Sequence, residues 1–185
     1  MRKALAFGVS VALMCVCCAR EDLAHLGGDL SQDRKVRHYI SGVPFFPQST
    51  YQCGPSALAS VLNYYGCRVT PGEIAKAIYS ERLRGTLSID LVLYARRMGF
   101  SAKAYRGNLT DLKSHISKDR PLIVFQDLGY SLLAMPHFSV VIGYDDAEGD
   151  LILHSGKQRD KVTSYGRFSR TWREMDYWTL LILPN

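Results

Sequence analysis

The chain has 185 residues, a length that fits one domain with a short leader and argues against two full domains. Hydrophobic residues make up 47% of the sequence and charged residues 22%, the balance of a globular protein with a real core. The net charge of +6 comes from basic residues scattered along the chain, without a helical stripe or an aromatic-interleaved basic motif. This distribution disfavours a nucleic-acid surface and is compatible with contact to anionic lipid or acidic partners.

The first segment, Met1 to Ala19, has the pattern of an export signal. Arg2 and Lys3 give it a positive start, and an apolar run follows from Ala4 to Val16. The run is too short for a permanent membrane span. The sequence therefore predicts an exported protein.

Three cysteines crowd the end of this signal and loosely resemble a bacterial lipoprotein box. Cys18 fits best as the lipidated residue because Cys17 before it is small. Cleavage after Ala19 is the alternative, but it gives the cysteine cluster no purpose. Since Ala19 is not an Asp-type retention signal, we expect a lipid-anchored protein of the bacterial cell envelope, in the outer membrane and facing the periplasm.

Residues 20–37 are polar, contain a pair of glycines and predict a tether. A single domain is expected over 38–185, and it opens with the apolar, proline-bounded segment His38 to Pro47.

Helical patterns fill the first half of this domain. One helix is expected from Cys53 to Gly66, and a second begins at Thr70 with the N-cap, proline and glutamate of a capping box. A third is expected from Ser88 to Gly99 and a short fourth from Thr110 to Ile116.

Strand patterns fill the second half. They cover 121–125, 138–144 and 151–154, with a hairpin turn at 145–150 between the last two. A last helical turn at 168–175 and a last strand at 177–183 complete the chain. Helices followed by an antiparallel sheet indicate the α+β class.

Cys53 is the candidate nucleophile because it begins a helix. Unpaired N–H groups at a helix N-terminus stabilise a thiolate, so we expect the pKa of Cys53 to lie below that of a free thiol. Gly54 permits close approach, and Gln48 lies five residues upstream, where its amide could bind an oxyanion. Cys67 lies at the far end of the same helix, about 20 Å away at 1.5 Å per residue, so a disulfide is not expected.

His137 is the candidate base among five histidines. It follows Pro136 and opens an apolar strand, which would hold the imidazole at a rigid strand end. No His or Cys outside the leader falls at metal-ligand spacing, and no phosphate loop or dinucleotide fingerprint is present. The sequence therefore predicts neither a metal nor a cofactor.

Two blocks resemble the bacteriocin-processing, double-glycine leader peptidases and their stand-alone relatives: Val43 to Gly66 and Pro136 to Asp145. The resemblance extends over about Tyr39 to Asn185. It implies a papain-like fold, with Cys53 as nucleophile, His137 as general base and acid, Gln48 as oxyanion donor, and a peptide or protein as substrate.

The residue that orients the histidine departs from that family. Relatives carry Asp or Asn at the end of the following strand, whereas Leu151 to Gly156 contains neither. Ser155 is the candidate in its place and His154 the alternative, because side chains alternate along a strand. Asp145 and Asp146 are assigned to the hairpin turn.

The sequence thus predicts an exported cysteine peptidase with a Cys53–His137 pair. Two alternatives stay open: another acyl-transfer activity of the same pair, of the amidase or transglutaminase type, and a peptide-binding module that keeps the fold without cleaving.

Overall fold

The computed structural model describes residues 37–47, 52–129 and 133–185. Cys18 and Gln48, together with the predicted signal and most of the predicted tether, lie outside the described residues. The described residues belong to one compact unit, 35–185.

Five helices and seven strands occur in the described part of the chain. The helices are α1 (Cys53–Tyr64), α2 (Pro71–Ile78), α3 (Ser88–Arg97), α4 (Leu109–Ile116) and α5 (Tyr165–Arg173). The strands are β1 (Arg37–Tyr39), β2 (Phe100–Arg106), β3 (Leu122–Asp127), β4 (Pro136–Asp145), β5 (Asp150–Ser155), β6 (Gln158–Ser164) and β7 (Trp178–Pro184).

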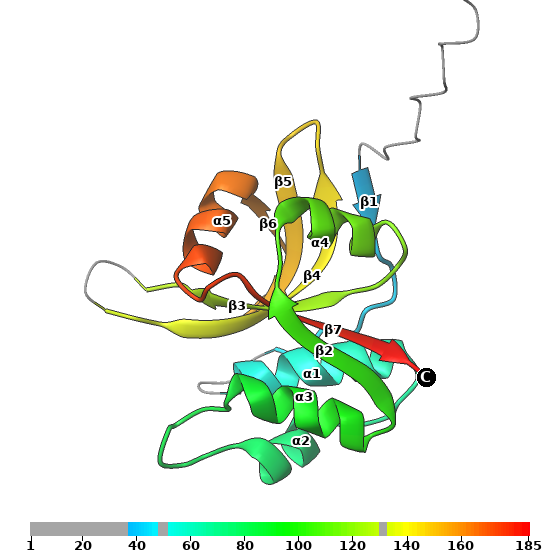
Figure 1. Cartoon of the computed structure of the whole chain (residues 1–185), viewed down its shortest axis with the longest axis vertical. Coiled ribbons are helices and arrows are strands. Elements are labelled where there is room, and N and C mark those ends of the chain that lie inside the picture. Colours follow the sequence, from blue (N-terminus) through cyan, green and yellow to red (C-terminus); the bar gives the residue numbers. More distant parts are fainter. Residues whose placement is uncertain (1–36, 48–51, 130–132) are drawn as a thin grey trace, which may run out of the picture. The chain divides into compact units, whose positions relative to one another are not determined.

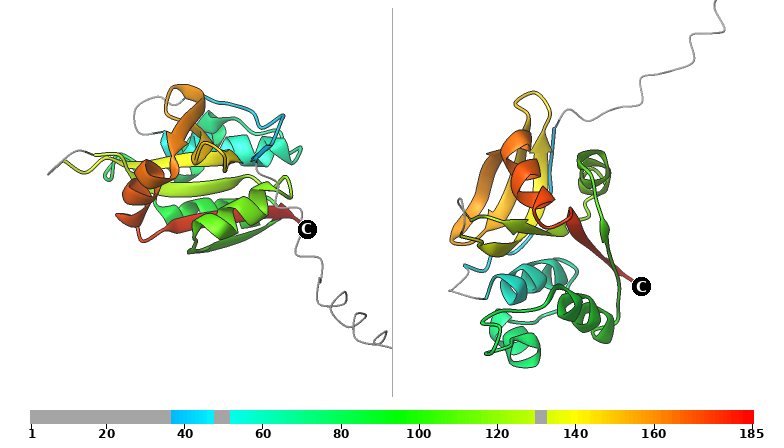
Figure 2. Two further views of the ribbon diagram at one scale, coloured as in Figure 1. Left: turned by 90° about the horizontal axis from the view of Figure 1, so that it is seen from above. Right: turned by 60° about the vertical axis from the view of Figure 1, so that its left-hand side comes forward.

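All seven strands form one antiparallel sheet in the order β2-β7-β3-β4-β5-β6, and β1 pairs with the far end of β4. Helices α1, α2 and α3 gather on one side of the sheet, while α4 and α5 lie on the other (Figures 1 and 2). The predicted α+β class, with N-terminal helices packed on an antiparallel sheet, is confirmed.

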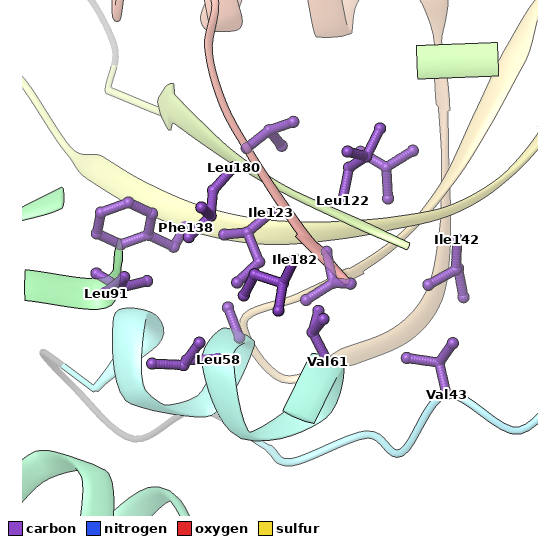
Figure 3. Close-up of a cluster of buried hydrophobic side chains, with 14 of the residues drawn as sticks. Val43, Leu58, Val61, Leu91, Leu122, Ile123, Phe138, Ile142, Leu180 and Ile182 are labelled. Carbon is purple, nitrogen blue, oxygen red and sulfur yellow. The ribbon is translucent and has the colours of Figure 1, made fainter. Parts of the chain in front are cut away.

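Helix α1 is the centre of the core. Every residue from Gly54 to Leu62 is buried, which explains why the helix is apolar or small on nearly all sides. Figure 3 shows Leu58 and Val61 of α1 beneath Ile123 of β3 and Ile182 of β7. The middle of α1 is thereby packed against the sheet.

The predicted signals that end α1 and begin α2 are present. The Thr70 hydroxyl accepts from the Glu73 N–H, and the Glu73 carboxylate accepts from the Thr70 N–H, so the predicted capping box of α2 is confirmed. After α1 the chain turns at Gly66, whose φ of +85° favours glycine.

Strands β1, β2 and β6 were not predicted from the sequence. Strand β6 has exposed residues at five of its seven positions, and β2 and β6 are the two outermost strands of the sheet order. Edge strands carry polar and charged residues that hide the apolar alternation of a half-buried strand. The β6 strand matters for the site because it pairs with β5 next to Ser155.

The β4–β5 turn is held by Asp145, whose carboxylate accepts from the Ala147 and Glu148 N–H groups. This confirms that Asp145 serves the turn. Asp146 instead binds Lys113 of α4 and the Tyr165 hydroxyl of α5. None of the helices in the described ranges is long and apolar enough to cross a membrane.

Candidate active site

Cys53 is the first residue of α1 and lies against the start of β4. Backbone N–H groups of Phe138, Gly54 and Cys53 itself are directed at its thiol. Gly54 leaves little room for a side chain, because a Cβ there would meet the Cβ of Thr86 at 3.2 Å and a ring carbon of Phe138 at 3.4 Å. Close packing at Gly54 thus sets the thiol beside the peptide that follows His137.

The thiol is less acidic than the sequence led us to expect. Burial raises the pKa of Cys53 above its ordinary value, and the three backbone N–H groups lower it by less than burial raises it. The expectation of a lowered pKa is therefore wrong for the free protein. The physical reason is that the helix N-terminus is packed into the core.

His137 lies at the start of β4 and contacts one serine, which a second serine holds in turn. The Ser155 hydroxyl of β5 is 3.2 Å from His137 Nε2, and the Ser139 hydroxyl donates to Ser155 Oγ over 3.1 Å. Both serines are buried. Because Nε2 is engaged by Ser155, Nδ1 is the ring nitrogen left to exchange a proton with a thiol.

The imidazole is held neutral by its surroundings. Burial, and secondly the charge of Lys161, lowers the pKa of His137 to about 4. Together with the raised pKa of Cys53, this favours a neutral thiol and a neutral imidazole in the free protein.

His154 lies elsewhere. It is buried, its Nε2 is 3.1 Å from the Val43 carbonyl, and its ring packs edge-on against Phe45 at a centroid distance of 5.2 Å. On the other side of the ring, Nδ1 accepts from the Asp160 N–H. Of the two neighbours considered as the orienting residue, Ser155 contacts His137, while His154 ties β5 to the segment that precedes α1.

Cys53 and His137 line the same groove, which has a volume of about 870 Å³. One wall comes from the loop 83–87 before α3, and the other from residues 134–138 at the start of β4. Leu83, Leu87 and Met135 line it while being at least half exposed, at 56%, 50% and 59%. Exposed apolar side chains gathered at a groove are a mark of a binding surface.

Sequence reasoning missed this apolar wall and also missed Lys161. Leu83 and Leu87 fall in a loop without periodicity, and Lys161 belongs to the unrecognised strand β6. Alternation within Gln158–Ser164 was the signal that could have placed Lys161 and Thr163 on one face. No group of three or more potential metal ligands occurs among the described residues.

We expect the buried imidazole to make stability depend on pH. An unfolded histidine titrates near its ordinary pKa of 6.5, whereas folding lowers the pKa of His137 to about 4. The unfolded state therefore binds more protons over this range, and the free energy of unfolding falls as pH drops from 6.5 towards 4, by up to about 3 kcal/mol from this group. Denaturant unfolding of wild type and His137→Gln at several pH values measures the difference.

The comparison isolates one residue, because burial also lowers the pKa values of His115 and His154 and both remain in the variant. Equal pH slopes in the two proteins would contradict a buried, neutral His137.

The family profile described as the Peptidase_C39 like family matches residues 40–179. An uncharacterized protein of Methanothermobacter marburgensis is 34% identical over 98 residues, which is 53% of this chain and 61% of that protein. One of Methanothermobacter thermautotrophicus is 32% identical over 98 residues, 52% of this chain and 61% of its own length. The chain thus spans about three fifths of the curated relatives that it matches.

Solved structures share the fold. The peptidase domain of Streptococcus ComA, a bifunctional ABC transporter of quorum sensing, has a TM-score of 0.64 at 24% identity, covering 77% of this chain and 99% of that domain. A C39-like peptidase of Bacillus anthracis has a TM-score of 0.66 at 16% identity, covering 80% of this chain and 98% of that chain. A double-glycine motif protease of an AMS/PCAT transporter was solved with a leader peptide. It has a TM-score of 0.61 at 21% identity, covering 80% of this chain and 95% of that chain.

Proposed function

The chain belongs to the Peptidase_C39 like family, and from that premise we propose that it is an exported cysteine peptidase hydrolysing peptide bonds through Cys53 and His137. The observation that carries the proposal is that both side chains line one groove, while the Ser155 hydroxyl contacts Nε2 of His137. Nucleophile, base and orienting group are the parts that covalent acyl transfer requires.

In the proposed reaction His137 Nδ1 takes the thiol proton, and the Cys53 thiolate attacks the carbonyl carbon of the scissile bond. Backbone N–H groups at the start of α1 and the Gln48 amide would stabilise the oxyanion. Collapse of the tetrahedral intermediate transfers the proton from His137 to the leaving amine. Water, activated by the same imidazole, then releases the acyl group and restores the thiol.

The groove favours an extended peptide with apolar side chains near the cleaved bond. Leu83, Leu87 and Met135 offer the apolar surface, and none of the lining residues that the structure describes is acidic. A solved structure that shares the fold was determined with a leader peptide. We propose that a peptide of this kind is the substrate.

Labelling with a peptide electrophile directed at thiols tests the proposal. We expect one adduct, on Cys53, and loss of labelling in Cys53→Ala. Labelling of His137→Ala should be slowed by on the order of 10²-fold or more, the usual contribution of a positioned general base. Adducts formed equally on Cys53 and Cys67, at rates indifferent to His137, would remove the case for a catalytic pair.

A second candidate function is a peptide-binding module that does not cleave. The observation in its favour is that burial raises the pKa of Cys53 and lowers the pKa of His137, which keeps the pair neutral. Binding of an apolar peptide with the same affinity in wild type and Cys53→Ala, without any product, would select this function.

Ser155→Ala should lower kcat/KM for peptide hydrolysis by about tenfold without changing KM. The hydroxyl orients the imidazole but carries no charge, so its loss should cost less than loss of a carboxylate does in serine enzymes, about 10⁴-fold. Steady-state kinetics on one peptide measures the effect. An unchanged kcat would show that another group holds His137; Ser155→Thr, which keeps the hydroxyl, is the matched control.

We also propose that Met1 to Ala19 directs export, that 20–37 tethers the 38–185 domain, and that Cys18 carries the lipid anchor. These rest on the positive start, the apolar run and the cysteine cluster of the sequence. Mass spectrometry of the mature protein should find diacylglycerol on Cys18. A product that begins at Arg20 would show cleavage without lipidation.

A further inference from the structure

A second cavity lies behind the imidazole, on the α5 side of the sheet. It has a volume of about 620 Å³ and is enclosed by β3, β5, β6 and α5. Ser155 forms part of its wall, so the residue that contacts His137 Nε2 also borders this cavity. The groove with Cys53 is lined by His137 itself.

The cavity is cationic, and none of the described residues that line it is acidic. Lys161 of β6 and Arg167 and Arg170 of α5 line it, together with the hydroxyls of Thr163 and Thr171. Among the described residues, these three cations form no ion pair. Neighbouring arginines do: Arg159 lies 3.7 Å from Asp160, and Arg173 lies 3.4 Å from Glu174. Three cations around one cavity, without an ion-pair partner in the described part of the chain, favour binding of an anion.

The Ser155 hydroxyl has one hydrogen and two neighbours. It already accepts from Ser139, so in the free protein its own hydrogen is available to donate to His137 Nε2. With the hydroxyls oriented in this way the ring proton lies on Nδ1, whereas accepting a thiol proton at Nδ1 requires the ring proton on Nε2. The productive tautomer needs Nε2–H to donate to Ser155, whose hydrogen then turns either to the Ser139 hydroxyl or to an acceptor in the cavity. A negatively charged acceptor in the cavity favours this arrangement.

We propose that this cavity binds a small carboxylate, which accepts the Ser155 hydrogen and thereby switches His137 to the tautomer that accepts the Cys53 proton. The bound carboxylate supplies the charge that no carboxylate side chain of Leu151 to Gly156 provides. The inference rests on the proposed function, since it concerns the base of the same pair.

Neutralising the positive charge of the cavity also favours transfer of the Cys53 proton to His137. The charge of Lys161 contributes to the lowered pKa of His137, after burial. An anion beside Lys161 offsets that charge and raises the proton affinity of the imidazole. A neutral pair in the free protein thus becomes a competent pair in the anion-bound protein.

Binding is tested first, on the inactive Cys53→Ala protein with sodium acetate at constant ionic strength. We expect saturable NMR shifts of backbone amides on β5, β6 and α5, and their loss in the further double variant Arg167→Gln/Arg170→Gln. The matched control, Arg159→Gln/Arg173→Gln, removes two exposed charges outside the cavity and should keep the shifts. Shifts that never saturate, or that survive in the cavity variant, overturn the proposal.

Coupling is tested by the rate of Cys53 alkylation with iodoacetamide, a neutral reagent that needs no turnover. Acetate should raise the wild-type rate at pH 7 by about tenfold, the response to a shift of one unit in proton affinity. The increase should vanish in Ser155→Ala and in Arg167→Gln/Arg170→Gln but persist in the matched control. In Ser155→Asp, which carries its own carboxylate, the rate should be independent of acetate. Saturable binding without any change in rate overturns the switch.

Two sources of carboxylate are distinguished with substrates. If a free acid fills the cavity, acetate accelerates cleavage of peptide amides and peptide acids alike. If the substrate's own C-terminus fills it, peptide acids are cleaved faster than matched amides and acetate competes with them. Absence of cleavage of every peptide, with acetate still accelerating alkylation, would reject the proposed peptidase activity and leave this inference standing.

Discussion

Replacing Cys53 with alanine is expected to abolish peptide hydrolysis, a loss on the order of 10⁴-fold or more in kcat. Removal of a nucleophile eliminates the covalent route, and what remains is the catalysis given by binding and oxyanion stabilisation. The kinetic loss should come without loss of fold, because Cys53 lies at the groove and is only partly buried. Progress curves on a fluorogenic apolar peptide, with thermal unfolding in parallel, measure both.

Cys67 provides the matched control within the same molecule. It is a free thiol that follows the other end of α1, outside the groove, and is likewise partly buried. Cys67→Ala should therefore cleave the peptide at the wild-type rate. Residual hydrolysis by Cys53→Ala within a factor of about 10 of wild type would mean that another group performs the chemistry.

Local signals in the sequence were enough to predict the elements that carry the pair. The capping box at Thr70, the glycine turn at Gly66 and the apolar run after His137 act within a few residues, and all three are present in the structure. Such signals are readable because the same contacts that end or begin an element are made by its nearest neighbours in the chain.

The electrostatics of the pair could not be predicted in this way. The pKa of Cys53 depends on how deeply the start of α1 is buried, and the pKa of His137 depends on burial and on Lys161, a residue of β6. Both are set by packing between elements distant in sequence. Because β6 has an exposed, polar pattern, its pairing with β5 and the cationic cavity that results were not predicted.

The contact between Ser155 and His137 could be predicted in part from the sequence. Alternation along a strand limits the choice to Ser155 or His154, and the antiparallel pairing of β4 with β5 then decides which of them faces the imidazole. An irregularity in the pairing of β5 with β6, between Leu153 and Ser155, falls at this point. The geometry is therefore set by register, while the role of Ser155 in catalysis is a proposal that its variants test.

Phe138→Ala is expected to have the largest effect on stability, lowering the free energy of unfolding by about 3–5 kcal/mol. Phe138 is only 2% exposed and stacks on Phe125 with ring centroids 4.2 Å apart. It also meets Trp178 edge-on at 5.7 Å, and Figure 3 shows it beside Leu91 of α3. Removing the ring leaves a cavity between the sheet and the helices that rigid neighbours on both sides cannot fill.

This residue also joins the core to the site, since its backbone N–H is directed at the Cys53 thiol. A domain stabilised by about 5–15 kcal/mol would lose a large part of its margin, so the fold and the packed environment of Cys53 should be lost together at a lower temperature than in wild type. Urea unfolding followed by tryptophan fluorescence gives the free energy. Val162→Ala is the control, because this β6 side chain is 60% exposed. It should change the free energy of unfolding by less than about 0.5 kcal/mol. A loss below about 1 kcal/mol for Phe138→Ala would contradict its place between the helices and the sheet.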